Sequence, residues 1–302
     1  MLLKTLVSEF GFDCRVRELT ERTTKNYEKQ LGYFLTFLEE HHQVTTLEEV
    51  TPAHVKEFIS IFQLKGCKPS YVNDLLKAVK CLFRYAYTEQ YTSQLLTRNI
   101  KNLKEPKVLI HTFSPSEIAD MINYHHASDF LSLRNKVITM VLFDTGIRVT
   151  ELIEMKPDQI QDNHFIIHGK GRKERVVPKS PFVGKWLAKY MTVRNDYFEY
   201  KIAAQNVFLS KNGKPLTEEA ISKFLKTTAK AVGVNPSVRV SPHTCRHTFS
   251  QEQLKNGIDL FSLSRLLGHT NISVTQRYLN SIKDAQILSA ASKTGVLANL
   301  IR

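Results

Sequence analysis

The chain has 302 residues, of which 42% are hydrophobic and 24% are charged. These values are typical of a soluble globular protein with one large or two ordinary domains. No apolar run approaches the ~20 residues that cross a membrane, and the first residues lack a signal-peptide cleavage site, so we expect a cytoplasmic protein without membrane segments. The four cysteines have neither disulfide nor metal-ligand spacing, which predicts reduced thiols.

The chain carries a formal net charge of +13. This surplus favours a polyanionic partner, most simply nucleic acid, and the alternative is a basic surface that only aids solubility. Residues 1–108 contain 16 basic and 13 acidic side chains, whereas residues 109–302 contain 26 and 16. Most of the positive charge therefore belongs to the second part of the chain.

Helical signals dominate the first hundred residues. Apolar side chains recur at helical spacing in 23–41, and Thr51-Pro52 marks the start of a helix that runs to about Leu64. Between them, Thr46-Leu47-Glu48-Glu49 has the form of a capping box. We expect a third helix over 71–88 and a shorter one near Leu95. Together these segments predict a compact helical bundle.

The clearest domain boundary precedes residue 114. Ser114 begins a capping box that Glu117 completes, with a proline at the first helical position. The segment before it is basic and has no helical period. We therefore expect a helical domain over 1–105, a linker over 106–113 and a second domain over 114–302.

The second domain mixes helices with a short sheet. Residues 134–143 predict an apolar helix that ends near Gly146, and a further helix restarts over 149–155. The short apolar runs 165–168 and 175–178 flank a charged, glycine-containing turn, which predicts a β-hairpin.

Another strand is expected at 207–210, followed by a helix that Thr217 caps and Gly233 closes. The expected fold class is therefore mainly α with a small β-sheet.

The stretch from Ser241 to Tyr278 holds two histidines, an arginine and a tyrosine that can converge on one phosphate. Ser241 and Pro242 form a helix start, so His243 and Arg246, three residues apart, share one helix face.

A second helix in this stretch, over 259–267, ends at Gly268, and His269 follows directly. Tyr278 lies in a last short helical segment over 273–279, where Ile272 and Val274 are expected to be buried.

Four motifs in this order resemble the tyrosine recombinase (phage integrase) family. They are Thr145-Gly146-Ile147-Arg148-Val149-Thr150-Glu151-Leu152, then Gly169-Lys170-Gly171-Arg172-Lys173-Glu174-Arg175, then His243-x-x-Arg246, and finally Leu267-Gly268-His269 with a tyrosine nine residues on. The resemblance is strong from about 110 to 280 and only general over 10–100. Chain length and layout are most similar to Xer-type recombinases and the small integrases of mobile elements.

The resemblance implies a helical core-binding domain that clamps DNA and an α+β catalytic domain that cleaves it. The implied catalytic residues are Arg148, Lys170, His243, Arg246, His269 and Tyr278. Free tyrosine, with a pKa of ~10, is a poor nucleophile at neutral pH, so attack on phosphorus requires a proton acceptor and a strong positive field.

In this interpretation Tyr278 forms a 3′-phosphotyrosyl intermediate. Arg148 and Arg246 bind the non-bridging oxygens, and His243 acts as the general base or orients the phosphate. His269 donates a hydrogen bond to the phosphate. Lys170 is the general acid to the departing 5′ oxygen, with Lys173 as its competitor.

Glu151 would orient neighbouring active-site side chains without reacting. The reaction needs no metal, ATP or other cofactor.

The resemblance further implies double-stranded DNA with an inverted-repeat core site and four identical or mixed protomers that exchange strands through a Holliday junction. The amphipathic tail 283–302 either packs on its own domain or docks on a neighbouring protomer. Basic residues of the first domain either contact phosphates or are simply solvated; they are Lys65, Lys68, Lys77, Lys80 and Arg84.

Other interpretations stay open. A type IB topoisomerase-like relaxing enzyme would use similar tyrosine chemistry, and a non-catalytic DNA-binding protein would use the same fold. Integration, excision, inversion and chromosome-dimer resolution are not separated by the sequence. His243 and His247 have the spacing of a zinc pair but no third ligand nearby, and the pairs 41–42 and 125–126 are expected at the surface.

Overall fold

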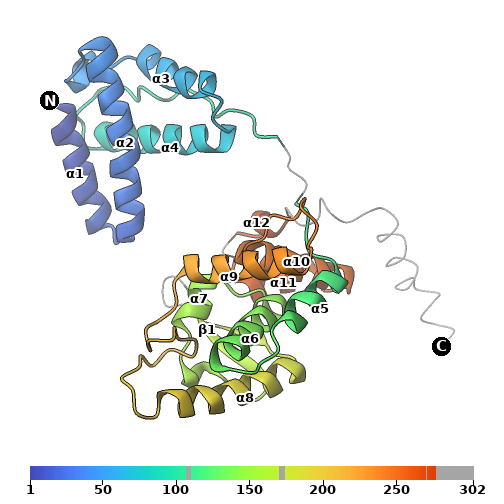
Figure 1. The fold of residues 1–302 in the computed structure, drawn as a ribbon. Coiled ribbons are helices and arrows are strands. Elements are labelled where there is room, and N and C mark those ends of the chain that lie inside the picture. The colour runs from blue at the N-terminus through green and yellow to red at the C-terminus, as the bar shows by residue number, and fades with distance from the viewer. Residues whose placement is uncertain (107–109, 170–173, 270, 277–302) are drawn as a thin grey trace. The chain divides into compact units, whose positions relative to one another are not determined.

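The computed structural model describes residues 1–106, 110–169, 174–269 and 271–276. Contacts divide the chain into two compact units, Met1–Lys107 and Val108–Arg302, and each unit has its own hydrophobic core. Figure 1 colours the first unit blue to cyan and the second green to red. No helix among the described residues is long and apolar enough to cross a membrane.

The first unit is a bundle of helices. Its elements are α1 (Leu3–Val16), α2 (Glu21–His42), the 3₁₀ turn η1 (Leu47–Glu49), α3 (Pro52–Leu64) and α4 (Pro69–Thr88). The three helices expected from the sequence are confirmed, and the Thr46 amide donates to Glu49 Oε2 at 3.2 Å, as a capping box requires. The helix expected near Leu95 was wrong, because that segment consists of turns.

Helix α1 was not anticipated from the sequence. Leu3, Leu6 and Phe10 are nevertheless spaced three and four apart, and all three are buried. They pack with α2 and α4. In the same core, the rings of Phe34 on α2 and Phe58 on α3 lie 5.1 Å apart between centroids. The first residues of the chain are thus part of the bundle core.

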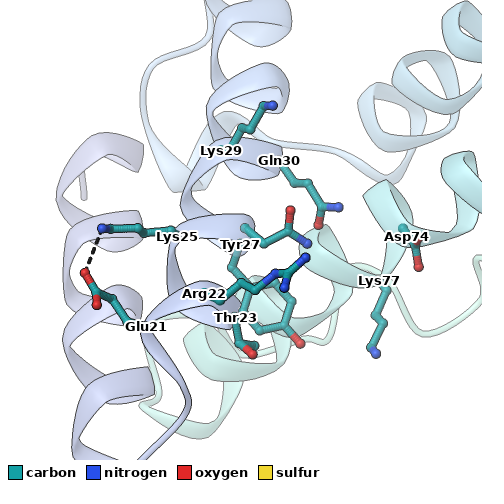
Figure 2. A pocket seen from close by; sticks show the side chains of 10 residues that line it. Glu21, Arg22, Thr23, Lys25, Tyr27, Lys29, Gln30, Asp74 and Lys77 are labelled. Atoms are coloured by element: carbon teal, nitrogen blue, oxygen red, sulfur yellow. Dashed lines mark ion pairs between the residues drawn. The ribbon is translucent and has the colours of Figure 1, made fainter. Parts of the chain in front are cut away.

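A hollow with a volume of about 790 Å³ lies on the first unit between α2 and α4 (Figure 2). Four of its ten lining residues are basic: Arg22, Lys25, Lys29 and Lys77. Lys25 pairs with Glu21 at 2.7 Å, whereas Lys77 belongs to α4 and was already a candidate for phosphate contact. Glu21 and Asp74 are its two acidic lining residues, so the hollow is a concavity with a net basic lining drawn from two helices.

The remaining elements of the described chain all belong to the second unit. They are α5 (Pro115–Tyr124), α6 (Phe130–Thr145), α7 (Val149–Glu154), η2 (Pro157–Gln159), β1 (His164–His168), β2 (Glu174–Pro178), α8 (Pro181–Phe198), α9 (Glu218–Ala231), α10 (Pro242–Lys255), α11 (Leu260–Leu267) and α12 (Ser273–Gln276). Helix α8 was not anticipated. The expected class, mainly α with a small sheet, is confirmed.

Strands β1 and β2 pair antiparallel, with His164 opposite Pro178 and His168 opposite Glu174. This confirms the two expected strands; the turn residues 170–173 lie outside the described part of the chain. The strand expected at 207–210 was wrong, since this segment makes only one bridge, from Leu209 to Pro215. Its carbonyls are bound by side chains instead: Tyr190 donates to Val207 and Arg134 donates to Leu209.

Helix α6 runs through the middle of the second unit and is buried on nearly all sides. Its Lys136 donates to the carbonyls of Ile122 and His125 and lies 4.8 Å from the Trp186 ring centroid.

The surface position expected for His125 was wrong. Its ring is buried and 3.1 Å from the Thr228 hydroxyl, because the end of α5 packs against α9.

Candidate active site

The site begins where α6 ends. Gly146 has the left-handed φ of 60°, and a Cβ there would lie 2.3 Å from the Phe249 ring. Only glycine fits this conformation and this close approach. The turn makes Arg148 the N-cap of α7, so the structure places its side chain beside the end of α6 as the sequence predicted.

Glu151 lies in the first turn of α7 and holds Arg148 in place through two hydrogen bonds. The Arg148 amide donates to Glu151 Oε2 at 2.7 Å, and Arg148 Nη1 donates to Oε1 at 2.9 Å. The Glu151 side chain is only 7% exposed, whereas that of Arg148 is 41% exposed. Arg148 is therefore held from inside and still faces solvent, where an anion can approach.

Arg246 enters from α10, which Ser241 caps by accepting from the Thr244 amide. The guanidinium is buried, and it donates to the Gly146 carbonyl at 2.7 Å and to the Leu267 carbonyl at 2.6 Å. These bonds join α10 to the ends of α6 and α11. They fix the position of a charge that is costly to bury without partners.

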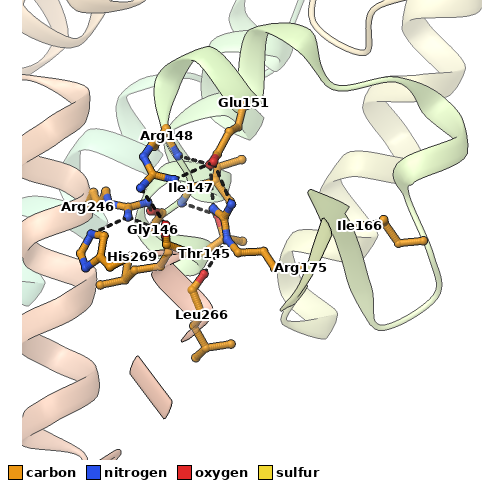
Figure 3. Close-up of polar contacts among 12 residues, drawn as sticks. Thr145, Gly146, Ile147, Arg148, Glu151, Ile166, Arg175, Arg246, Leu266 and His269 are labelled. Atoms are coloured by element: carbon orange, nitrogen blue, oxygen red, sulfur yellow. Dashed lines mark hydrogen bonds and ion pairs between the residues drawn. The ribbon is translucent and has the colours of Figure 1, made fainter. Parts of the chain in front are cut away.

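Three arginine side chains donate hydrogen bonds to backbone carbonyls at the C-terminal end of α11 (Figure 3). Arg175 Nε donates to the Leu266 carbonyl at 2.8 Å, Arg246 to Leu267, and Arg148 Nη2 to Gly268 at 3.1 Å. A helix C-terminus carries partial negative charge and unpaired carbonyls, so it suits cations. Three segments far apart in the sequence are thereby brought to one point.

His269 follows this helix end. Its Nε2 lies 3.0 Å from Arg246 Nη2, and its Nδ1 lies 2.8 Å from the Thr275 hydroxyl. Because a guanidinium only donates, Nε2 accepts, which assigns the proton to Nδ1. Burial, with the charges of Arg246 and Arg148, lowers the pKa of His269 to about 4, so the ring is neutral at pH 7.

His243 lies one turn before Arg246 on α10. Its side chain keeps contact with solvent, and its ring centroid is 4.3 Å from that of His247. Partial burial of the ring, with the charges of Arg246 and Arg239, lowers its pKa below the usual range. A neutral imidazole is able to accept a proton.

Comparisons with known proteins agree with this geometry. Residues 111–284 match the phage integrase family, and residues 6–93 match the N-terminal SAM-like domain of phage integrases. The chain belongs to the phage integrase family. A tyrosine recombinase XerD from Listeria monocytogenes serovar 1/2a is 30% identical over 270 residues, which cover 88% of this chain and 90% of the relative. By family membership this protein is a tyrosine site-specific recombinase.

Solved structures have the same fold. A XerH site-specific recombinase bound to palindromic difH substrate matches with a TM-score of 0.76 at 20% identity, covering 95% of this chain and 84% of that one. A lambda integrase tetramer bound to a Holliday junction matches with a TM-score of 0.70 at 17% identity, covering 92% and 77%.

The structure brings three of the six sequence-predicted site residues of the recombinase together: Arg148, Arg246 and His269. His243 lies near enough to Arg246 for that charge to lower its pKa. Lys170, its competitor Lys173 and Tyr278 lie outside the described residues. The burial expected of Ile272 and Val274 was wrong: each is 40% exposed, and it is Thr275 that is buried and contacts His269.

Two residues of the site were missed by the sequence analysis. Thr275 is buried and contacts His269, and Arg175 binds Glu151 with both terminal nitrogens, at 2.7 and 2.8 Å. Arg175 lies two residues before the buried Val177 on β2, so both share the inner strand face. A charged residue on the buried face of a strand is the signal that would have identified it. Among the described residues, no group of three or more side chains is arranged to hold a metal.

Proposed function

We propose that this recombinase cleaves and rejoins double-stranded DNA at a specific site, with Tyr278 forming a 3′-phosphotyrosyl intermediate. The observation that carries the proposal is the convergence of Arg148, Arg246 and His269 at the end of α11. Retaining the phosphodiester bond as a phosphotyrosine conserves its energy, so rejoining requires no ATP.

Arg148 and Arg246 would bind the non-bridging oxygens of the scissile phosphate. Both guanidinium groups are held by backbone carbonyls before DNA arrives, so little reorganisation opposes stabilisation of the extra charge in the transition state. The anion would raise the pKa of neighbouring His269, which enables its ring to donate to the phosphate.

Proton transfer is assigned to two residues. His243, neutral at pH 7 because of its lowered pKa, would accept the Tyr278 proton or orient the phosphate. Lys170 would protonate the departing 5′ oxygen, and Lys173 stays its competitor. Two matched variants, Lys170→Ala and Lys173→Ala, distinguish them by which one abolishes cleavage.

The first unit would contribute DNA binding. Its hollow collects Arg22, Lys25, Lys29 and Lys77 from two neighbouring helices, and such a basic concavity suits a phosphate backbone. Lys80 donates to Asn102 at 2.8 Å and Lys65 lies 5.5 Å from the Phe62 ring centroid. Of the earlier lysine candidates, Lys77 is the one that lines this hollow.

The DNA partner would contain an inverted-repeat core, and four identical or mixed protomers would act on two duplexes. XerH was solved on a palindromic substrate and lambda integrase as a tetramer on a Holliday junction, which supports this arrangement for those proteins. We extend it to this chain as a proposal. The assignments of residues 1–105 as the clamp, 106–113 as the linker and 114–302 as the catalytic domain with a docking tail have the same status.

A covalent-trapping assay tests the proposal. The full chain is incubated without metal on nicked duplexes taken from DNA flanking its own gene and from the host chromosome's dimer-resolution site. We expect a denaturation-resistant adduct, lost in Tyr278→Phe and kept in the matched control Tyr200→Phe, whose side chain is exposed. The duplex that forms the adduct separates a mobile-element recombinase from a dimer resolvase.

An adduct that persists in Tyr278→Phe would refute the choice of nucleophile. No adduct on a duplex that the protein binds would instead support the non-catalytic alternative.

A further inference from the structure

Two arginines contact Glu151, and Arg175 is less exposed than Arg148. Its side chain is 12% exposed, against 41% for Arg148. All three nitrogens of its guanidinium are engaged by the protein: Nε by the Leu266 carbonyl, and the two terminal nitrogens by the Glu151 carboxylate. All three bonds run to the protein, so the charge of Arg175 acts first on Glu151 and on the end of α11.

The Glu151 carboxylate is shared by two cations. Each oxygen accepts one bond from Arg175 and one from Arg148, at distances from 2.7 to 2.9 Å. Burial alone would raise the pKa of Glu151, but the bonds and charge of Arg175, with the bonds from Arg148, lower it instead. The carboxylate is therefore ionised, and its negative charge must be balanced inside the site.

We propose that Arg175 is a positioning residue that neutralises Glu151, so that the charge of Arg148 stays available for the scissile phosphate. The proposal rests on the phosphate site described under the proposed function. Arg148, Arg175, Arg246 and Glu151 together carry a net charge of +2. Without Arg175 this falls to +1, and Arg148 and Glu151 form a neutral pair.

The packing around Arg175 supports a specific role for this guanidinium. A Cβ on Gly268, whose φ is +64°, would lie 3.0 to 3.2 Å from atoms of the Arg175 side chain. Glycine at 268 thus allows the close approach that joins β2 to the end of α11. In the sequence, the candidate general acid Lys170 precedes Arg175 by five residues.

Four variants separate charge from structure: Arg175→Met, Arg175→Lys, Glu151→Gln, and the double variant Arg175→Met with Glu151→Gln. The double variant restores a net charge of +2, because it removes one cation and one anion from the wild-type set. Far-UV circular dichroism and the fluorescence of Trp186, the single tryptophan, report whether each variant is folded.

The first measurement is independent of recombination. The protein is labelled with ¹³C-histidine, the His269 ring signal is identified by its loss in His269→Gln, and inorganic phosphate is titrated at constant ionic strength. We expect Arg175→Met to bind phosphate about tenfold more weakly, as removal of one nearby charge implies. The double variant and Arg175→Lys should stay within about threefold of wild type, and Glu151→Gln should bind at least as tightly as wild type.

If Arg175 had a purely structural role, the order of phosphate affinities would differ: the double variant would bind phosphate at least as weakly as Arg175→Met. That order, or wild-type phosphate binding in Arg175→Met, would overturn the proposal. If Arg175→Met does not fold, the double variant decides. Wild-type affinity without Arg175 supports charge neutralisation, and a tenfold loss refutes it.

The second measurement is the single-turnover rate of adduct formation on the nicked duplex, with the affinity for the duplex measured separately. We expect Arg175→Met to slow the rate at saturating protein by about 100-fold, with little change in affinity for the duplex. In the double variant, the added Glu151→Gln should raise this rate again by at least tenfold. Absence of any adduct in the wild type would refute the proposed function alone. The phosphate titration would still test the role of Arg175.

Discussion

The two units of the recombinase differ in how deeply they bury their ion pairs. Ion pairs of the first unit lie at the surface, as with Lys25 and Glu21, whose side chains are 72% and 80% exposed. In the second unit Glu151 and Arg175 are nearly enclosed. Exposed pairs contribute about 0–1 kcal/mol and are screened by salt, whereas breaking a buried pair costs about 3–5 kcal/mol. The first unit is therefore suited to adaptable contact with a polyanion, and the second to a fixed cationic site.

The largest expected effect is on catalysis. Replacing Arg246 with alanine removes one proposed phosphate ligand and the donor to the Gly146 and Leu267 carbonyls. We expect the rate of adduct formation to fall by at least about 1,000-fold, as for loss of a preorganised charge-stabilising donor. Arg265→Ala, an exposed arginine on α11, is the matched control and should stay close to wild type. Comparable rates for the two variants would contradict the buried-charge account.

The next effect is on stability. Glu151→Ala leaves Arg148 and Arg175 without their shared carboxylate, so we expect the free energy of unfolding of the second unit to fall by about 3–5 kcal/mol. Glu21→Ala, which breaks the exposed pair with Lys25, should leave stability close to wild type. Urea unfolding followed by Trp186 fluorescence measures the second unit, and circular dichroism measures both. Equal losses of unfolding free energy in Glu151→Ala and Glu21→Ala would contradict the proposed difference between the units.

The pH dependence of stability probes the interior of the second unit. Burial, with the charges of Lys136 and Arg134, lowers the pKa of His125 to about 4. As the pH falls below 6.5, the unfolded chain binds a proton that the folded chain does not, so stability decreases as the pH falls toward 4. The loss from this group is about 3 kcal/mol when complete.

Replacement of His125 separates its contribution from that of His269, whose pKa is lowered in the same direction. Between pH 4 and 6.5, the slope of the unfolding free energy against pH reports how many more protons the unfolded chain binds. His125→Asn should lower this number by about one. His126→Asn, an exposed neighbour, should leave the slope unchanged. An unchanged slope in His125→Asn would show that this ring does not remain neutral when folded.

The smallest effect is expected in the first unit. Lys77→Ala should weaken duplex binding uniformly across sequences and reduce the slope of log affinity against log salt by about 1. Lys4→Ala, which removes an exposed lysine outside the hollow, is the control. Gel-shift titrations from 50 to 200 mM salt measure both slopes. Identical slopes for Lys77→Ala and wild type would remove the hollow from the DNA interface.

Local signals predicted much of the fold. The capping residues Thr46, Ser114 and Thr217 lie where the structure places helix starts, because each satisfies backbone amides within its own turn. Segment 207–210 was mistaken for a strand, since its apolar run does not reveal that Tyr190 and Arg134 bind its carbonyls from other elements. Helix α8 was missed although Ser180 and Pro181 mark its start.

The site was predictable where its residues lie in motifs. Arg148, Arg246 and His269 were identified by spacing. Glu151 was expected to orient its neighbours, and the structure bonds it to Arg148 and Arg175. The role of the α11 end was not predictable, because it depends on backbone carbonyls that have no sequence signature. His125 was misplaced for a similar reason: its burial follows from the packing of α5 on α9.

The most direct test of the central claim is peptide mapping of the trapped protein–DNA complex by mass spectrometry. Trypsin cleaves after Arg277 and Lys283, so Tyr278 lies at the start of a six-residue peptide, Tyr278–Lys283. After nuclease digestion, we predict a nucleotide mass on this peptide, joined through a 3′ phosphate to Tyr278. A nucleotide on any other residue, or an unmodified peptide in a complex that resists denaturation, would contradict the account.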